Sequence, residues 1–204
     1  MLKLKMISML FGTALATQAQ QVTLVTPSSM QFSDPAYRVT FRYPAKWNFS
    51  MENEFYTPVS ITSPENPSRG FVYFSSNNGG YNPYPRTNLA GAEFVFSNRQ
   101  AVSADACLKQ VLQGDANAKM LGTETINSIR YMHAKTAGAG MCHQFSEDIY
   151  AVSGGATCYL FDLAVETLCA FDNTREITNG ELAQVHASLE KILSSVEINN
   201  VKKD

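Results

Sequence analysis

Residues 141–169, MCHQFSEDIYAVSGGATCYLFDLAVETLC, contain three of the four cysteines in this 204-residue chain. Apolar and polar residues alternate on both sides of the break at Ser153-Gly154-Gly155-Ala156, which is the period of half-buried β-strands. Glycine supplies the positive φ angles that tight hairpin turns require. The stretch therefore predicts two long antiparallel strands joined by a Gly-rich turn.

The same hairpin restricts how the cysteines can pair. A two-residue turn at 154–155 would leave Cys142 near Cys169 at the open end of the hairpin and Cys158 near the turn. Cys158 and Cys169 would be about 35 Å apart at roughly 3.3 Å per residue, whereas bridged Cα atoms lie within about 7 Å of each other. Of the three possible connectivities, only Cys142–Cys169 together with Cys107–Cys158 passes this test.

The chemistry of these cysteines is predicted to be structural. An even cysteine count in an exported chain favours disulfides. The sequence contains no Cys-x-x-Cys pair, which would provide the close chelate of a structural zinc site or the activated dithiol of a redox motif. Zinc coordination and free buried thiols are the alternatives.

Residues 1–19 have the features of a secretory signal peptide. Lys3 and Lys5 precede an apolar run from Met6 to Ala16, and small and polar residues follow it up to Ala19. The run is shorter than the roughly 20 apolar residues that cross a bilayer as a helix. We expect cleavage after Ala19, a secreted or periplasmic location, and no membrane span in the mature chain.

The charge balance argues against nucleic acid as a partner. The formal net charge is −2, and removal of the predicted signal peptide would make the chain more acidic because it carries two lysines away. A mildly acidic protein lacks the basic surface that binds phosphate backbones. Apolar residues make up 45% of the chain, which is ordinary for one folded domain of this length.

Alternating patterns predict further strands before the cysteine-rich stretch. Residues 37–43, 56–62 and 70–75 are strand candidates, and Pro44 ends the first because proline cannot donate to a sheet ladder. Alternation from Ile126 to the glycines at 138–140 predicts another strand. Together with the hairpin in 141–169 it would form a three-stranded meander.

Two amphipathic helices complete the pattern. Ser103 can cap a helix that contains Cys107 on its packed face. Thr178 and Glu181 form a capping box ahead of an apolar stripe that runs to Val196. Short strands, a helix, longer strands and a closing helix predict an α+β layered sandwich with a mainly antiparallel sheet.

The stretch YRVTFRYPAKW, residues 37–47, resembles the opening strand of the PsbP-like family, in which an aromatic strand runs into a Tyr-Pro-x-x-Trp turn. The later strands at 129–137 and 158–167, followed by the helix that ends in SLEKILSSVEI, have a similar order. The resemblance covers much of residues 37–198.

This resemblance implies an α/β/α sandwich of the PsbP-like type and a non-enzymatic binding or accessory role. Known members include an extrinsic photosystem II subunit and a Ran-binding import factor. We expect one globular domain over 37–198, an N-terminal extension at 20–36 and a short tail at 199–204. No residue matches a photosystem-binding or Ran-binding position, so no functional residue is carried over.

Histidines on the predicted meander are the candidates for metal binding or catalysis. A three-residue turn at 138–140 would pair Lys135 with His143 and make His133 a diagonal neighbour of His143, while the next hairpin would place Glu166 across from His143. Two imidazoles and a carboxylate can bind zinc or serve in acid/base chemistry. Strand-surface histidines beside aromatic and acidic neighbours are the favoured alternative, because the set depends on two predicted registers.

Residues 75–90, rich in Asn, Gly and Pro, predict a long surface loop. Tyr81, Tyr84 and Arg86 offer apolar faces and hydrogen-bond donors, which is the composition of adaptable recognition surfaces. A loop that only connects two strands is the alternative.

The functional expectation is a binding or accessory protein for an unknown protein or small-molecule partner, without a cofactor. Gly-x-Ser-x-Gly, His-Glu-x-x-His and phosphate-binding Gly-rich motifs are absent from the sequence. Glu147, Asp148 and Asp162 fall on alternating strand positions where solvated side chains are expected. A metal-assisted hydrolase that uses the two histidines and Glu166, and a structural envelope or extracellular component, are the alternatives.

Overall fold

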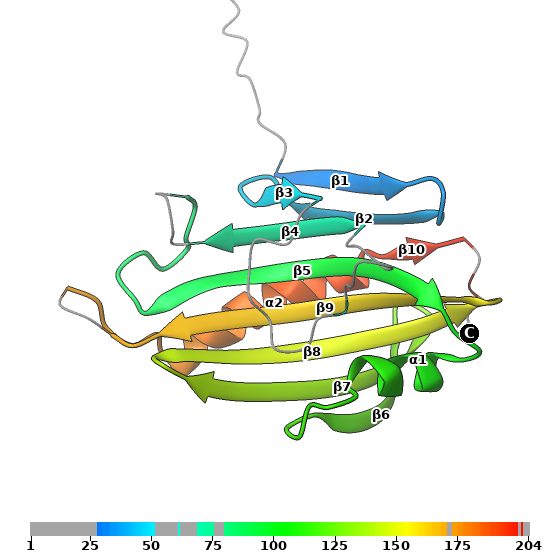
Figure 1. Ribbon diagram of the computed structural model, residues 1–204. Helices are drawn as coiled ribbons and strands as arrows, with labels where there is room; N and C mark the ends of the chain where they lie inside the picture. Colours follow the sequence, from blue (N-terminus) through cyan, green and yellow to red (C-terminus); the bar gives the residue numbers. More distant parts are fainter. Residues whose placement is uncertain are drawn as a thin grey trace, which may run out of the picture.

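The described residues of the chain fold into two antiparallel sheets and two helices (Figure 1). The computed structural model describes residues 28–51, 61, 69–75, 80–170, 173–199 and 201. In chain order the elements are β1 (Ser29–Asp34), β2 (Val39–Pro44), β3 (Asn48–Ser50), β4 (Gly70–Ser75), β5 (Leu89–Gln100), α1 (Ala104–Val111), β6 (Lys119–Ile126), β7 (Ile129–Gly140), β8 (His143–Gly154), β9 (Thr157–Leu168), α2 (Asn179–Ser194) and β10 (Glu197–Ile198).

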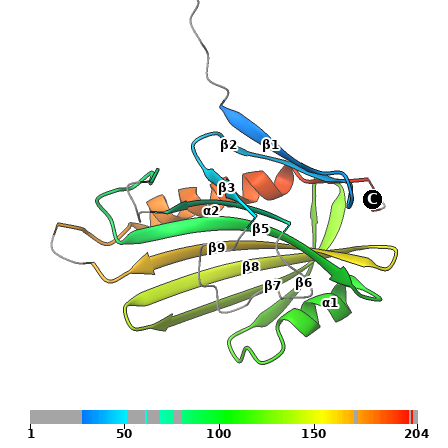
Figure 2. The ribbon, with the colours of Figure 1, turned by 45° about the horizontal axis from the view of Figure 1, so that its top comes forward.

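The larger sheet has seven strands in the order β3-β4-β5-β9-β8-β7-β6, and the smaller one has the order β1-β2-β10. Figure 2 shows β1, β2 and α2 on one side of the large sheet and α1 on the other. One apolar core lies between the large sheet, α2 and the small sheet, and a second lies between the large sheet and α1. The predicted α+β sandwich with a mainly antiparallel sheet is therefore confirmed.

Both predicted helix caps are confirmed. The Ser103 side chain accepts a hydrogen bond from the backbone N–H of Ala106 at the start of α1. At the start of α2, the Thr178 hydroxyl accepts from the backbone N–H of Glu181, whose carboxylate accepts from the backbone N–H of Thr178. These reciprocal bonds satisfy N–H groups that a helix leaves without partners in its first turn.

The meander is confirmed, but its turns lie elsewhere. The β8–β9 register pairs Ser153 with Cys158, so the turn is at residues 155–156 and not at 154–155. The β7–β8 register pairs Gly140 with His143, so this turn contains Met141 and Cys142 and the predicted turn at 138–140 is wrong.

Cross-strand packing explains why the glycines at 138–140 do not form a turn. Gly138 lies opposite Phe145, and a Cβ atom on Gly138 would be 2.2 Å from the aromatic ring of Phe145. The glycine therefore admits a ring from the neighbouring strand. The turn is formed instead by Met141 and Cys142, which both have positive φ angles of 44° and 67°.

The predicted disulfide connectivity is confirmed. Cys107 in α1 bonds Cys158 in β9, with Cα atoms 6.4 Å apart, and Cys142 bonds Cys169, with Cα atoms 4.9 Å apart. The first disulfide is fully buried and ties α1 to the large sheet. The second joins the β7–β8 turn to the end of β9.

Other sequence expectations have mixed outcomes. The strand at 70–75 is confirmed as β4, and the strand at 37–43 is β2, which begins at Val39. The candidate strand at 56–62 lies outside the described residues apart from Ile61. The predicted signal peptide at 1–19 lies wholly outside them. β1 falls within the predicted extension at 20–36, so that part of the extension belongs to the fold.

Within the described ranges, no helix is both long and apolar enough to cross a membrane.

The two disulfides should differ in their contribution to stability. A Cys107→Ala/Cys158→Ala variant should lose about 4 kcal/mol of unfolding free energy, because the bond closes a 51-residue separation in the unfolded chain. Cys142→Ala/Cys169→Ala, with a 27-residue separation, should lose about 3.5 kcal/mol. Urea unfolding measures both losses. Equal stability of the wild type and the first variant would contradict the structural role of the buried bond.

Candidate functional site

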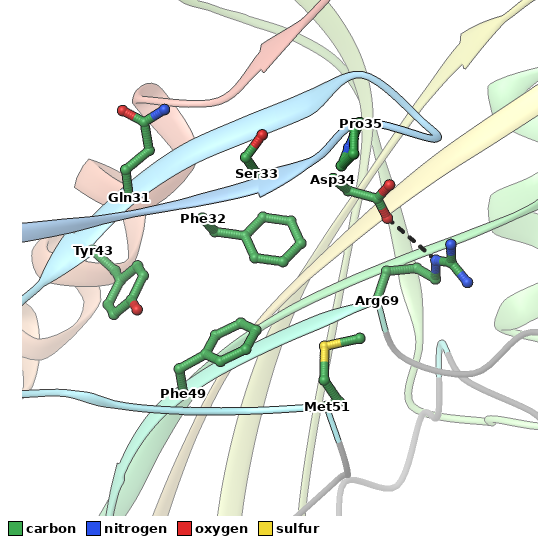
Figure 3. A pocket seen from close by; sticks show the side chains of 9 residues that line it. All are labelled: Gln31, Phe32, Ser33, Asp34, Pro35, Tyr43, Phe49, Met51 and Arg69. Carbon is green, nitrogen blue, oxygen red and sulfur yellow. Dashed lines mark hydrogen bonds and ion pairs between the residues drawn. The ribbon is translucent and has the colours of Figure 1, made fainter.

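A cleft of about 470 Å³ lies between the small sheet and the first strands of the large sheet (Figure 3). Its lining residues come from β1, β2, β3 and the segments next to them: Gln31, Phe32, Ser33, Asp34, Pro35, Tyr43, Phe49, Met51 and Arg69. This volume falls in the range of small-ligand sites, roughly 300–1,000 Å³.

The floor of the cleft is a cluster of aromatic rings. Alternation along β1 points Phe32 inward, where its ring stacks on Phe41 with the centroids 4.6 Å apart. The rim residue Phe49 of β3 packs on this floor, 5.6 Å from Phe32 and 6.3 Å from Tyr43, measured between centroids. Gly70 permits this arrangement, because a Cβ atom there would be only 3.0 Å from the Phe32 ring.

Large apolar side chains at the rim are left open to solvent. Phe49 is 42% exposed and Met51 is 55% exposed, whereas Phe32 and Tyr43 beneath them are buried. Apolar side chains of this size gathered around a concavity are typical of sites that contact another molecule.

An ion pair closes one end of the cleft. The Nε–H of Arg69 donates to Asp34 Oδ2 over 3.3 Å, and the Arg69 guanidinium lies over the Tyr37 ring at 4.7 Å. The other carboxylate oxygen of Asp34 accepts from the backbone N–H groups of Ala36 and Tyr37 at 2.9 and 3.2 Å. Backbone N–H groups thus hold the Asp34 carboxylate in place, and the Tyr37 ring holds the Arg69 guanidinium.

The tyrosine loop predicted as a binding surface does not line this cleft. The Tyr84 hydroxyl bonds Gln184 of α2, and the Tyr81 ring meets Phe74 edge-on at 6.1 Å. Arg86 contributes its backbone carbonyl, which accepts from the N–H of Arg175. These contacts attach the loop to the fold. Residues 76–79 of the predicted loop lie outside the described part of the chain.

The structure does not assemble the predicted site of two histidines and a carboxylate. His133 pairs in register with Tyr150, seven positions along β7 from Gly140, which pairs with His143. Seven positions correspond to about 23 Å of strand, and an odd offset places the two histidines on opposite faces of the sheet. The predicted diagonal contact between His133 and His143 is wrong.

Each histidine has its own acidic neighbours. His143 Nδ1 lies 2.5 Å from Glu166 Oε1, so the predicted contact between these two residues is confirmed, although Glu166 pairs in register with Phe145. His133 lies between Glu124 and Asp148, with ring nitrogens 3.2 and 2.9 Å from their carboxylates. Among the described residues, no three His, Cys, Asp or Glu side chains are arranged to hold a metal ion.

Carboxylates on the α1 face of the large sheet were not anticipated as buried groups. Glu93 of β5 and Glu147 of β8 flank Ala164 of β9 in register, and Asp162 lies on the same face two residues before Ala164. All three carboxylate side chains are buried, which corrects the expectation of solvated positions for Glu147 and Asp162. Glu147 and Asp162 do lie at alternating strand positions, as expected, but α1 and the apolar residues around it cover the face to which they point.

Burial changes the acidity of these groups. It raises the pKa of Glu93 well above its usual value, and the charges of Glu147 and Glu166 raise that pKa further. Burial likewise raises the pKa of Asp162, with added effects from Glu147 and Glu93. Neither carboxylate oxygen of Glu93 has a hydrogen-bond partner among the described residues. The protonated form of Glu93 is therefore the form that the folded protein favours.

Comparisons with known proteins bear on the fold alone. No protein-family model and no curated protein sequence matches the chain. A solved structure from Bacteroides thetaiotaomicron is 14% identical with a TM-score of 0.46 over 85% of this chain, which spans 49% of that protein, about half its length.

Two further solved structures are similar. Cyanobacterial PsbP from Synechocystis sp. PCC 6803 is 12% identical with a TM-score of 0.43, over 87% of this chain and 97% of that one. LpqN, involved in cell envelope biogenesis of Mycobacterium tuberculosis, is 11% identical with a TM-score of 0.44, over 84% of this chain and 92% of that one. The chain has a weak, fold-level resemblance to PsbP.

The buried Glu93 should make stability depend on pH. Since its pKa is raised in the folded state, folding takes up a proton, and this contribution to stability falls as pH rises above the unfolded pKa of about 4.3. Glu93→Gln removes that proton uptake. The unfolding free energy of the variant, relative to that of the wild type, should therefore rise by up to about 1.4 kcal/mol for each pH unit between pH 5 and 8.

Urea unfolding at several pH values measures this difference. Glu197→Gln, an exposed change of the same chemistry on β10, is the control and should leave the pH profile unchanged. A difference between Glu93→Gln and the wild type that stays constant with pH would show that Glu93 is ionised in the folded protein.

Proposed function

We propose that this protein is a secreted or periplasmic binding or accessory protein that holds an apolar group of its partner in the cleft beneath β1. The observation that carries the proposal is a concave aromatic floor beneath Phe49 and Met51, which expose large apolar surfaces at its rim. Covering the exposed part of each side chain would contribute about 2 kcal/mol to binding.

The location is supported by the two disulfides. Such bonds persist in oxidising compartments and are rare in the cytosol, so they favour a location outside the cytoplasm. The signal-like pattern in residues 1–19 also supports a location outside the cytoplasm.

Binding of the uncharged fluorescent probe 1-N-phenylnaphthylamine tests the cleft. The probe should bind the wild type and gain fluorescence, and Met51→Ser should weaken its binding about tenfold, because the loss of apolar contact corresponds to about 1.4 kcal/mol. Met141→Ser is the matched control: this methionine is 97% exposed in the β7–β8 turn and lies outside the cleft. It should bind the probe as the wild type does. Equal affinities of the two serine variants would contradict the proposed site.

A further inference from the structure

We propose that the partner of the cleft is an extended peptide segment that pairs as an added strand with the free edge of β1 and directs an acidic residue toward Arg69. This inference rests on the proposed binding function and names the class of partner. It follows from three features of the cleft: a β1 edge that pairs with no other described strand, an apolar floor beside that edge, and a guanidinium at one end.

The hydrogen-bond pattern shows which main-chain groups of β1 face outward. Ala45 N–H donates to the Ser28 carbonyl over 3.3 Å, so this register pair is hydrogen-bonded and alternate pairs along the ladder are too. The N–H and C=O of Arg42 instead bond the Ser195 hydroxyl, at 2.8 and 3.2 Å, on the far side of β2. Gln31, the register partner of Arg42, therefore directs its own N–H and C=O away from β2.

This free edge borders the cleft. β1 is the outermost described strand of the small sheet (Figure 1). Ser33, two residues after Gln31, directs its main-chain N–H and C=O outward in the same way. Both residues line the cleft, and the Phe32 ring between them points into it (Figure 3). A strand laid along this edge would bond Gln31 and Ser33 while its side chains cover Phe49.

An apolar small molecule or an acyl chain would satisfy only part of this surface. It would fill the apolar floor and leave the N–H and C=O groups of Gln31 and Ser33 without a protein partner. Addition of a strand to an exposed sheet edge satisfies both, because main-chain bonds supply affinity and alternate side chains enter the adjacent pocket. The edge therefore favours a peptide.

The charge at the end of the cleft indicates an acidic residue on that peptide. Arg69 uses Nε to bond Asp34, and the described residues offer its two Nη groups no hydrogen-bond acceptor. The Arg69 side chain keeps 33% of its surface exposed. A carboxylate on the partner can accept from these Nη groups, since guanidinium binds carboxylate through paired N–H donors.

A labelled peptide tests the pairing. The probe is fluorescein-labelled Val-Thr-Val-Thr-Glu-Thr, in which the two valines and the glutamate share one face of an extended strand. Its binding is followed by fluorescence anisotropy. A counterpart N-methylated at every amide keeps the side chains and loses all main-chain donors, so it should bind at least about tenfold more weakly. Replacing Glu by Gln in the probe should weaken binding about fivefold at low salt.

A proline variant of the protein tests the same edge. Ser33→Pro removes an outward N–H that makes no bond to β2, so the fold is kept while the peptide should bind at least about tenfold more weakly. Ser29→Pro changes the same edge outside the cleft and should bind the peptide as the wild type does. Both variants should still bind 1-N-phenylnaphthylamine, which shows that the cleft is intact.

The outcomes separate this inference from the function on which it rests. If the naphthylamine probe binds but the methylated peptide binds as tightly as its parent, or the two proline variants do not differ, strand pairing is wrong and the apolar binding site stands. If neither the probe nor the peptide binds, both proposals fail.

Discussion

The burial of β9 on both of its faces is the constraint on which the rest of the structure depends. Its residues from Cys158 to Val165 are all buried between β5 and β8. On one face Phe161 stacks on Phe96 of β5, with centroids 5.4 Å apart, in the core that α2 covers. On the other face Cys158 is bonded to Cys107 of α1. Both helices are therefore held through one strand.

The two faces of β9 lead to different chemistry. The α2 face is continuous with the aromatic core that reaches Phe32 and the floor of the cleft. The α1 face combines apolar residues with the buried carboxylates of Glu93, Glu147 and Asp162. Burial raises the pKa of Glu93 and of Asp162, which favours their protonated forms. The proposed recognition site lies at the margin of the first core, where β1 ends the small sheet and aromatic packing is left partly open.

Register errors explain which parts of the site could be predicted. The β8–β9 register differs from the predicted one by two residues. An even shift keeps every side chain on its predicted face, so the predicted pairing of Cys142 with Cys169 was still correct. The β7–β8 register differs by five residues, and an odd shift turns His133 to the opposite face from His143. The cleft itself had no local signal, because its lining comes from strands of two different sheets.

The sequence by itself determined the helix starts at Ser103 and Thr178, the alternating strands and the disulfide connectivity, because each depends on groups a few residues apart or on the reach of one hairpin. Only the tertiary structure decided where the turns fall, which carboxylates are buried and where the cleft opens. Those features depend on contacts across strands, such as the Phe145 ring against Gly138, whose partners are known only once the registers are set.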